Sequence, residues 1–147
     1  MEIVNTKVIY EMLGKQKEPN RAHDTDSGFD LYSPEECVLL PGELKTIDLK
    51  IRFHIPKIVG WLCEGQIRPK SGRSKNGLEV SLGTADQSYR GSVSATIHNR
   101  TKETVVIKEN EKLCQIVWVL IPIMEMEKGI VSTDTERGIG GFGSTGL

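Results

Sequence analysis

The sequence has no long hydrophobic run. Nowhere in its 147 residues do apolar side chains approach the ~18 consecutive positions that a membrane-spanning helix requires. The opening residues, Met1 to Asn5, have neither the basic start nor the apolar centre of a secretory signal peptide. We therefore expect a protein that has no membrane partner and is not secreted.

An excess of charge of either sign is also missing. The chain carries 19 lysine and arginine residues against 20 aspartate and glutamate residues, which gives a net charge of -1. A chain so close to neutral has no general attraction for a polyanion. No nucleic acid partner is therefore expected.

Cysteine is scarce, with only Cys37, Cys63 and Cys114 in the chain. Their odd number and wide spacing fit neither a zinc motif nor a disulfide framework, so we expect buried thiols in a reducing compartment. The run Asn99-Arg100-Thr101 matches a glycosylation sequon. Because secretion is not expected, we do not expect Asn99 to be glycosylated.

No long helix is predicted either. The clearest pattern runs from Ile47 to Ile55, where apolar and polar residues alternate as in a strand with one buried face. Turn signals every ~8–12 residues indicate an all-β sandwich or jelly roll, which we assign to residues 1–136. Further strands are predicted at residues 2–10, 93–97, 104–108 and 113–121, the last apolar enough to be buried on both faces.

The stretch from Gly83 to Val93 is the first candidate for chemistry. Glycines at both ends predict a β-hairpin, with Asp86 and Tyr89 at its turn. A carboxylate there can accept a proton from water once a substrate excludes bulk solvent, and the aromatic ring can pack against a sugar or a base. The alternative is that Asp86 is an ordinary turn residue and Tyr89 closes a core edge.

Three other places have unusual polar patterns. Residues 68–77 hold four cations, two serines and two glycines, which indicates either an anion cradle, with a short helix near Ser71, or a solvated basic turn. Gly28 beside Asp30 indicates a close backbone approach, or else a strand edge with a solvated carboxylate. Gln115 lies within the most apolar strand, so its amide must bond to backbone or face a site.

The last ten residues before Leu147 are rich in glycine. Arg137 to Gly146 contains five glycines, and such a segment cannot pack a core. A flexible tail is one interpretation. The other is an arm, residues 137–147, that a ligand orders through backbone N–H groups, hydroxyls, an arginine and the ring of Phe142.

Taken together, these stretches resemble the five motifs of the trimeric dUTPase family, in the family's order and over nearly the whole chain. The matching segments are Ser27–Leu31, Pro69–Ser74, Gly83–Gly91, Glu111–Ile116 and Arg137–Gly146. The resemblance implies a jelly-roll subunit and a homotrimer with three sites at subunit interfaces. It also implies hydrolysis of dUTP to dUMP and pyrophosphate, with Mg²⁺ on the triphosphate.

The resemblance also implies a role for each matching residue. Asp86 is the general base for water that attacks the α-phosphorus, and Tyr89 packs under the deoxyribose, where a 2′-hydroxyl would clash. Asp30 orients water near the metal, and Gln115 holds phosphate or metal-bound water. The other implied substrate-binding residues are Lys70, Ser71 and Gly72 for phosphate, Gly83 and Ala85 for the uracil edge, and Arg137, Phe142, Gly143, Ser144 and Thr145 in the arm.

The chain departs from the family pattern at four places. Lys70 stands where the family usually has arginine, and Arg73 where it has an apolar residue. Thr84-Ala85 replaces a bulky aliphatic pair, and Ser88 replaces an acid. Lysine keeps the positive charge but lacks the bidentate fork of arginine.

Rival functions differ from this one in identifiable features. A dCTP deaminase resembles the fold but lacks an ending like Gly140 to Gly146, and a capsid-type jelly roll does not need the ordered polar motifs. A nucleotide-gated regulatory protein would use the arm as its switch, although intact Asp86 and Arg137 favour catalysis. A cytoplasmic location is expected, or the cytoplasm or nucleus of a host cell if the protein is viral.

Overall fold

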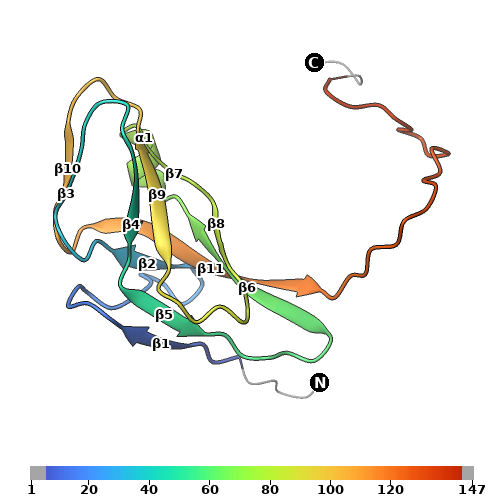
Figure 1. The fold of residues 1–147 in the computed structure, drawn as a ribbon, viewed down its shortest axis with the longest axis horizontal. Coiled ribbons are helices and arrows are strands. Elements are labelled where there is room, and N and C mark those ends of the chain that lie inside the picture. The colour runs from blue at the N-terminus through green and yellow to red at the C-terminus, as the bar shows by residue number, and fades with distance from the viewer. Residues whose placement is uncertain (1–5, 144–147) are drawn as a thin grey trace.

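The computed structural model describes residues 6–143, in which the chain forms eleven strands and one short helix (Figure 1). This confirms the predicted all-β class. The elements are β1 (Ile9–Met12), β2 (Gly28–Tyr32), β3 (Cys37–Leu39), β4 (Leu44–Asp48), β5 (Ile51–His54), β6 (Trp61–Arg68), α1 (Ser71–Lys75), β7 (Leu78–Val80), β8 (Gly83–Ala85), β9 (Ser94–Asn99), β10 (Val105–Ile107) and β11 (Lys112–Pro122).

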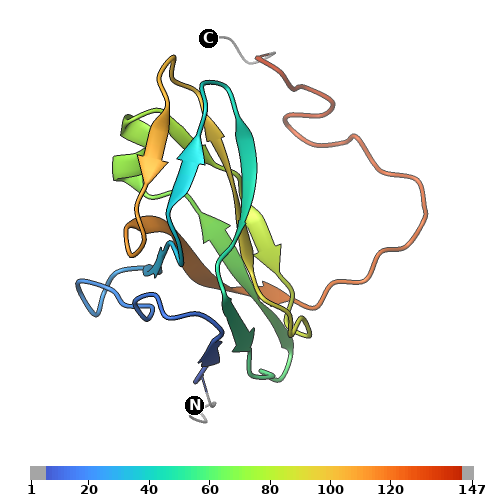
Figure 2. The same ribbon diagram turned by 60° about the vertical axis from the view of Figure 1, so that its left-hand side comes forward.

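The strands form antiparallel sheets around one hydrophobic core. The largest sheets have the orders β2-β11-β6-β8 and β4-β9-β7, and both contribute buried side chains to the core. The pairs β3-β10 and β1-β5 lie at opposite ends of the body in both ribbon views (Figures 1 and 2). The arrangement is the predicted jelly-roll-like sandwich, in which alternating residues of each strand point inward.

The alternating stretch from Ile47 to Ile55 forms two strands rather than the single strand predicted. β4 pairs with β9 and ends at Asp48, whereas β5 pairs with β1 and begins at Ile51. Lys50 adopts a φ of 51° between them, so the chain bends and changes sheets there. The predicted inward face is nevertheless buried, because the bend keeps Leu49 directed into the core.

The predicted hairpin from Gly83 to Val93 is wrong. β8 pairs with β6, whereas β9 pairs with β4 and β7, so residues 86–93 connect two different sheets. Glycines flank such a crossing loop just as they flank a hairpin, and the sequence pattern does not distinguish them. The first strand also differs from its prediction, since β1 begins only at Ile9 and ends at Met12. Residues 2–5 of that prediction lie outside the described residues.

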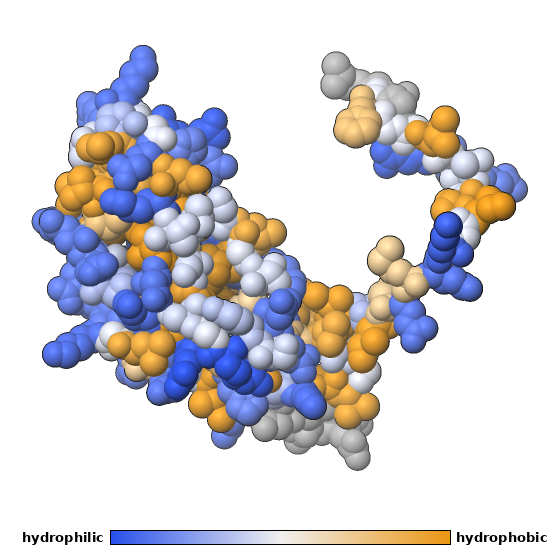
Figure 3. Space-filling view, viewed as in Figure 1, coloured by the Kyte–Doolittle hydropathy of each residue, from blue (hydrophilic) through white to orange (hydrophobic). Residues whose placement is uncertain are grey.

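β11 is the longest strand, and its two halves are buried differently. The half that includes Leu113 and Ile116 is buried, as predicted. Toward its end the prediction of burial on both faces is wrong, because Leu120 is 50% exposed. Apolar side chains gather on the surface where β11 ends and the tail leaves the body (Figure 3). The exposed apolar residues on β6 and β11 there are Trp61, Leu62 and Leu120.

Beyond Pro122 the chain continues as an exposed tail. Residues 123–143 contain no strand or helix, and the tail arcs away from the body in both views (Figures 1 and 2). A short turn near its end is closed by a hydrogen bond from the Gly138 N–H to the Thr135 carbonyl. Within the described part of the chain, no helix is long and apolar enough to cross a membrane.

All three cysteines are free and buried, as predicted. Burial raises the pKa of the Cys114 thiol to about 12, and the negative charge of Asp30 adds to the effect. The thiol is therefore protonated at neutral pH and a poor nucleophile. These residues serve the core rather than chemistry.

The side chain of Asn99 joins three segments at one end of the sandwich. Its fully buried side chain donates from Nδ2 to the carbonyls of Leu39, Leu40 and Glu103 at 3.1, 3.1 and 2.8 Å. Its Oδ1 accepts from the backbone N–H and hydroxyl of Thr101 at 3.0 and 2.7 Å. The sequon match is thus a structural motif that ties β3, β9 and β10 together.

We predict that Asn99→Ala strongly destabilises the fold. Each buried polar group that loses its partner costs about 1–3 kcal/mol, so the free energy of unfolding should fall by about 3 kcal/mol or more. Urea unfolding at a fixed protein concentration measures this, with Asn76→Ala at the exposed end of α1 as the control. Equal stability of the two variants would contradict the role given to Asn99.

Candidate active site

Three hollows in the surface contain residues that the sequence analysis selected, and each is named here by one of them. The Asp30 cavity, of about 290 Å³, lies where β2, β11 and the start of α1 meet. The Tyr89 cavity, of about 190 Å³, is lined by β6, β8 and the loop 86–93. The Asp86 hollow, of about 460 Å³, lies between the other end of that loop and residues at the ends of β5, β6 and β11.

Asp30 is a buried carboxylate held between two lysines. Only 4% of the residue is exposed, and Lys70 Nζ lies 2.7 Å from Oδ1 while Lys112 Nζ lies 3.2 Å from Oδ2. Burial disfavours the charged form, but the hydrogen bonds and charges of both lysines outweigh it and hold the pKa of Asp30 below its usual value. With Arg21 and Asp26 also present, basic groups exceed acidic ones in this cavity, which favours an anionic ligand.

Gln115 reaches the same cavity from β11. Its neighbours in the sheet are Asp30 on β2 and Arg68 on β6, and its Nε2 donates to the Pro69 carbonyl at 3.0 Å. The close approach predicted at Gly28 is confirmed, because a Cβ there would lie only 3.0 Å from Cδ of Gln115. Glycine on β2 therefore makes room for the amide, and the amide fixes the chain before α1.

The short helix predicted near Ser71 is confirmed as α1. Ser71 and Gly72 are exposed on its first turn, directly after Lys70. Arg73, which departs from the family pattern, points toward β11: its Nε donates to the Lys112 carbonyl at 2.9 Å and its Nη2 pairs with Glu111 Oε2 at 2.6 Å. The substitution thus attaches α1 to β11.

The Tyr89 cavity brings together Gly83, Ala85 and Tyr89, three of the predicted substrate-binding residues. The Tyr89 hydroxyl donates to the Ser92 carbonyl at 2.9 Å. The ring also lies over Gly91, where a Cβ would be 2.6 Å from the ring carbon Cζ. The ring is therefore held in place while about half of the residue stays exposed and available for stacking.

Asp86 lies outside the Tyr89 cavity in a single chain. Its carbonyl accepts the Tyr89 N–H at 2.9 Å in a tight turn, and its exposed side chain lines the Asp86 hollow with His54, Glu64 and Arg90. The predicted base and the predicted stacking ring thus lie three residues apart on opposite sides of one loop. Water has free access to the carboxylate in this arrangement.

The described residues of the predicted arm lie apart from all three hollows. Arg137 Nε donates to the Gly140 carbonyl at 2.7 Å, and Phe142 is fully exposed with a φ of 50°. Gly143 is also exposed, whereas Ser144 and Thr145 lie outside the described residues. The described arm residues line none of the three hollows within one chain.

Two basic residues of the Asp30 cavity have no role predicted from the sequence. Lys112 falls inside the fourth motif, and a register shift in the pairing of β11 with β2 between Lys112 and Cys114 accompanies its contact with Asp30. Arg21 comes from the polar loop before β2, and its guanidinium lies 4.6 Å from the centre of the Phe29 ring. Neither a strand irregularity nor a loop position gives a signal in the sequence.

Ligands for a metal ion are few. Among residues 6–143 no three histidine, cysteine, aspartate or glutamate side chains come close enough to coordinate one. Asp30 and Gln115 supply oxygens to the Asp30 cavity, and the lysines already neutralise Asp30. This set is too small for a fully protein-held metal ion and fits only an ion that keeps most of its own water, such as Mg²⁺.

Comparisons with known proteins identify the family of this chain. A family model for dUTPase matches residues 15–146. Deoxyuridine 5'-triphosphate nucleotidohydrolase of Clostridium novyi is 39% identical over 132 residues, covering 88% of this chain and 90% of that protein. The enzyme of the same name from monkeypox virus is 35% identical over 133 residues, with 90% and 85% covered.

Solved structures are similar over the same range. A mutant dUTPase of Staphylococcus bacteriophage 80alpha with dUpNHpp has a TM-score of 0.86 and 26% identity, covering 98% of this chain and 100% of that one. A mutant dUTPase of phage phi11 of S. aureus, described with a structural Mg(II) ion, has a TM-score of 0.72 and 27% identity, with 88% and 99% covered. Because the match includes all three hollows and the tail, the chain belongs to the dUTPase family.

Proposed function

We propose that three copies of this chain form a homotrimer that hydrolyses dUTP to dUMP and pyrophosphate with Mg²⁺. One observation supports the proposed trimer. The residues of the five motifs are divided among the Asp30 cavity, the loop 86–93 and a tail whose described residues line none of the hollows. A site that uses all of them needs more than one chain. Such an enzyme limits uracil incorporation into DNA and supplies dUMP for dTMP synthesis.

The surface supports assembly. Trp61 and Leu62 on β6 lie opposite Pro122 and Ile121 on β11, and much of this apolar surface is exposed in a single chain (Figure 3). Exposed apolar surface of this kind marks an interaction site, and burying it between subunits is favourable. The interface we propose is accordingly apolar. The three buried thiols fit a cytoplasmic location.

Substrate binding divides between two subunits in this proposal. The Tyr89 cavity receives the deoxyuridine, with the Tyr89 ring against the sugar and the backbone at Gly83 and Ala85 facing the uracil edge. Lys70 and Gln115 of a neighbouring subunit bind the phosphates together with Ser71 and Gly72. The positive Asp30 cavity supports this, because it can accept part of the triphosphate charge.

The chemical step needs a base, an oriented water and exclusion of bulk solvent. Asp86 accepts a proton from the water that attacks the α-phosphorus, and its exposed carboxylate is reachable by that water. Asp30 and Gln115 would hold the water of a Mg²⁺ ion, which when bound would neutralise phosphate charge. The arm then closes over the substrate, with Arg137, Ser144 and Thr145 toward the γ-phosphate and Phe142 on the uracil, and excludes solvent.

The first prediction tests the activity and its base. The wild-type protein should release pyrophosphate from dUTP in preference to other deoxynucleoside triphosphates, and Asp86→Asn should lower the rate by ~10²–10⁴-fold, as loss of a general base does. Binding of dUTP should persist by isothermal titration. Glu64→Gln, in the same hollow, is the control and should retain activity. Ammonia release from dCTP, or an active Asp86→Asn, would contradict the assignment.

The second prediction concerns Lys70. Arginine should replace it with kcat/KM for dUTP equal or higher, because the guanidinium can pair with both the Asp30 carboxylate and phosphate. Lys70→Gln should lose roughly 10-fold or more, since it removes a charged hydrogen bond to a buried carboxylate. A large loss in Lys70→Arg would show that this lysine depends on a geometry that arginine cannot reproduce.

The third prediction concerns assembly and the arm. Removal of residues 137–147 should leave a folded trimer by sedimentation equilibrium, because the described arm residues, 137–143, contribute nothing to the core. Turnover of dUTP should fall by about 100-fold, the effect of poor alignment of reacting groups. A monomer at micromolar concentration, or full turnover without the arm, would contradict this prediction.

Closure of the arm can be read directly. Phe142→Trp, with Trp61 and Trp118 replaced by phenylalanine, should change its emission when a non-hydrolysable dUTP analogue and Mg²⁺ are added. Met126→Trp in the same background is a matched control, because Met126 is equally exposed but precedes the arm. Its emission should not change. Identical responses at both positions would argue against closure by the arm.

A further inference from the structure

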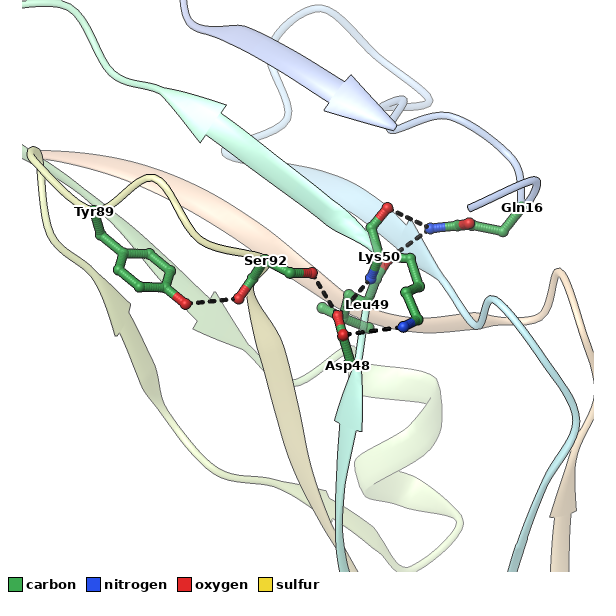
Figure 4. A network of polar contacts seen from close by, with 6 residues as sticks. All are labelled: Gln16, Asp48, Leu49, Lys50, Tyr89 and Ser92. Carbon is green, nitrogen blue, oxygen red and sulfur yellow. Dashed lines mark hydrogen bonds and ion pairs between the residues drawn. The ribbon is translucent and has the colours of Figure 1, made fainter. Parts of the chain in front are cut away.

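The loop that carries Tyr89 is bonded to the bend between β4 and β5 (Figure 4). The backbone N–H of Leu49 donates to the Val93 carbonyl, and the Val93 N–H donates to the Ile51 carbonyl, both at 2.9 Å. One side-chain contact accompanies them: the Ser92 hydroxyl donates a short hydrogen bond to Oδ1 of Asp48. Asp48 belongs to none of the five motifs.

Ser92 connects this contact to the Tyr89 ring. Its carbonyl accepts the Tyr89 hydroxyl at 2.9 Å, while its own hydroxyl is engaged by Asp48. Ser92 also lines the Tyr89 cavity. A shift of Ser92 would therefore move the hydroxyl end of the ring and the wall of the cavity together.

Asp48 is itself held in one orientation. Its Oδ1 also accepts the Lys50 backbone N–H at 2.9 Å, and its Oδ2 pairs with Lys50 Nζ at 3.3 Å. The hydrogen bond to the N–H two residues on supports the left-handed backbone of Lys50, where φ is 51°. The ion pair is half exposed and contributes little, so the hydrogen bonds define the position of the carboxylate.

The bend is also fixed from the side of the N-terminal segment. Gln16 is buried, and its Nε2 donates to the Leu49 carbonyl at 2.6 Å. The Leu13 N–H donates to the Lys50 carbonyl at 2.8 Å. Asp48 therefore projects toward the loop from a bend that is held in place by hydrogen bonds to the N-terminal segment (Figure 4).

We propose that Asp48 is a positioning residue for the Tyr89 cavity. Through Ser92 it fixes the ring of Tyr89, and it thereby sets the preference for deoxyribose over ribose. The proposal rests on the proposed function, in which the ring lies against the sugar. Discrimination against a single hydroxyl group requires a rigid cavity wall. A Tyr89 ring that can move therefore lets the ribonucleotide bind more readily.

The test compares kcat and KM for dUTP and UTP in the wild type, Asp48→Ala and Asp48→Asn. Asp48→Ala should raise KM for dUTP and lower the dUTP-to-UTP ratio of kcat/KM, each by roughly 10-fold, the effect of one hydrogen bond to a charged group. Asp48→Asn should keep most of the preference, because the amide oxygen still accepts from Ser92. Equal losses for both nucleotides, or equal effects of both substitutions, would overturn the proposal.

Two further variants define the route. Ser92→Ala should reproduce the effect of Asp48→Ala, and the double variant should be no worse than either, since both remove the same hydrogen bond. Glu79→Ala is the matched control, because it removes an exposed carboxylate from β7 that pairs with Arg100 and lies outside the Tyr89 cavity. Additive losses in the double variant, or a changed preference in Glu79→Ala, would contradict the route through Ser92.

Amide hydrogen exchange separates failure of this proposal from failure of the proposed function. Exchange in residues 86–93 should be faster in Asp48→Ala than in the wild type and unchanged in Glu79→Ala, whether or not dUTP is hydrolysed. A wild type that does not hydrolyse dUTP would refute the function and leave this measurement valid. Unchanged exchange in Asp48→Ala would refute the positioning role.

Discussion

The pairing of β11 with both β2 and β6 is the interaction on which the rest of this structure depends. It places Gln115 between Asp30 and Arg68, so three polar side chains from distant parts of the chain meet in one sheet. The same strand leads directly into the tail beyond Pro122. A shift of one residue in this register would turn its buried side chains to the opposite face, so the polar cluster and the core are specified together.

Charge in the Asp30 cavity is arranged for a ligand more than for stability. A buried carboxylate between two ammonium groups satisfies its own charge and leaves the cavity positive overall. Ion pairs of this kind contribute little net stability, because desolvation opposes the attraction between the partners. Their value lies in orientation: Asp30 holds Lys70 beside Ser71 and Gly72, where the proposed phosphates bind.

Much of this arrangement could be predicted from the sequence, because local patterns carry it. The alternation from Ile47 to Ile55 identified the buried face, and the five motifs identified most residues of the Asp30 cavity. The predictions that failed concern contacts between residues that are distant in sequence. No pattern shows that β8 and β9 belong to different sheets, that Lys50 takes a left-handed conformation, or that Lys112 reaches Asp30 beside a register shift. The exposure of Leu120 could not be predicted either, because it depends on which other parts of the fold cover the end of β11.

The proposed site is divided among separate surfaces, so its arm can be flexible whereas its Tyr89 cavity must be rigid. An arm rich in glycine loses much conformational freedom on closing, so bound substrate must supply the contacts that order it. That arrangement links closure to occupancy, but it gives no discrimination between deoxyribose and ribose unless the pocket is already rigid. The bend at Asp48 and the loop at Ser92 supply this rigidity within one subunit, before any neighbour or arm takes part. In the proposed enzyme, selectivity therefore resides in the folded core of each subunit, whereas the proposed catalytic site is completed only by assembly.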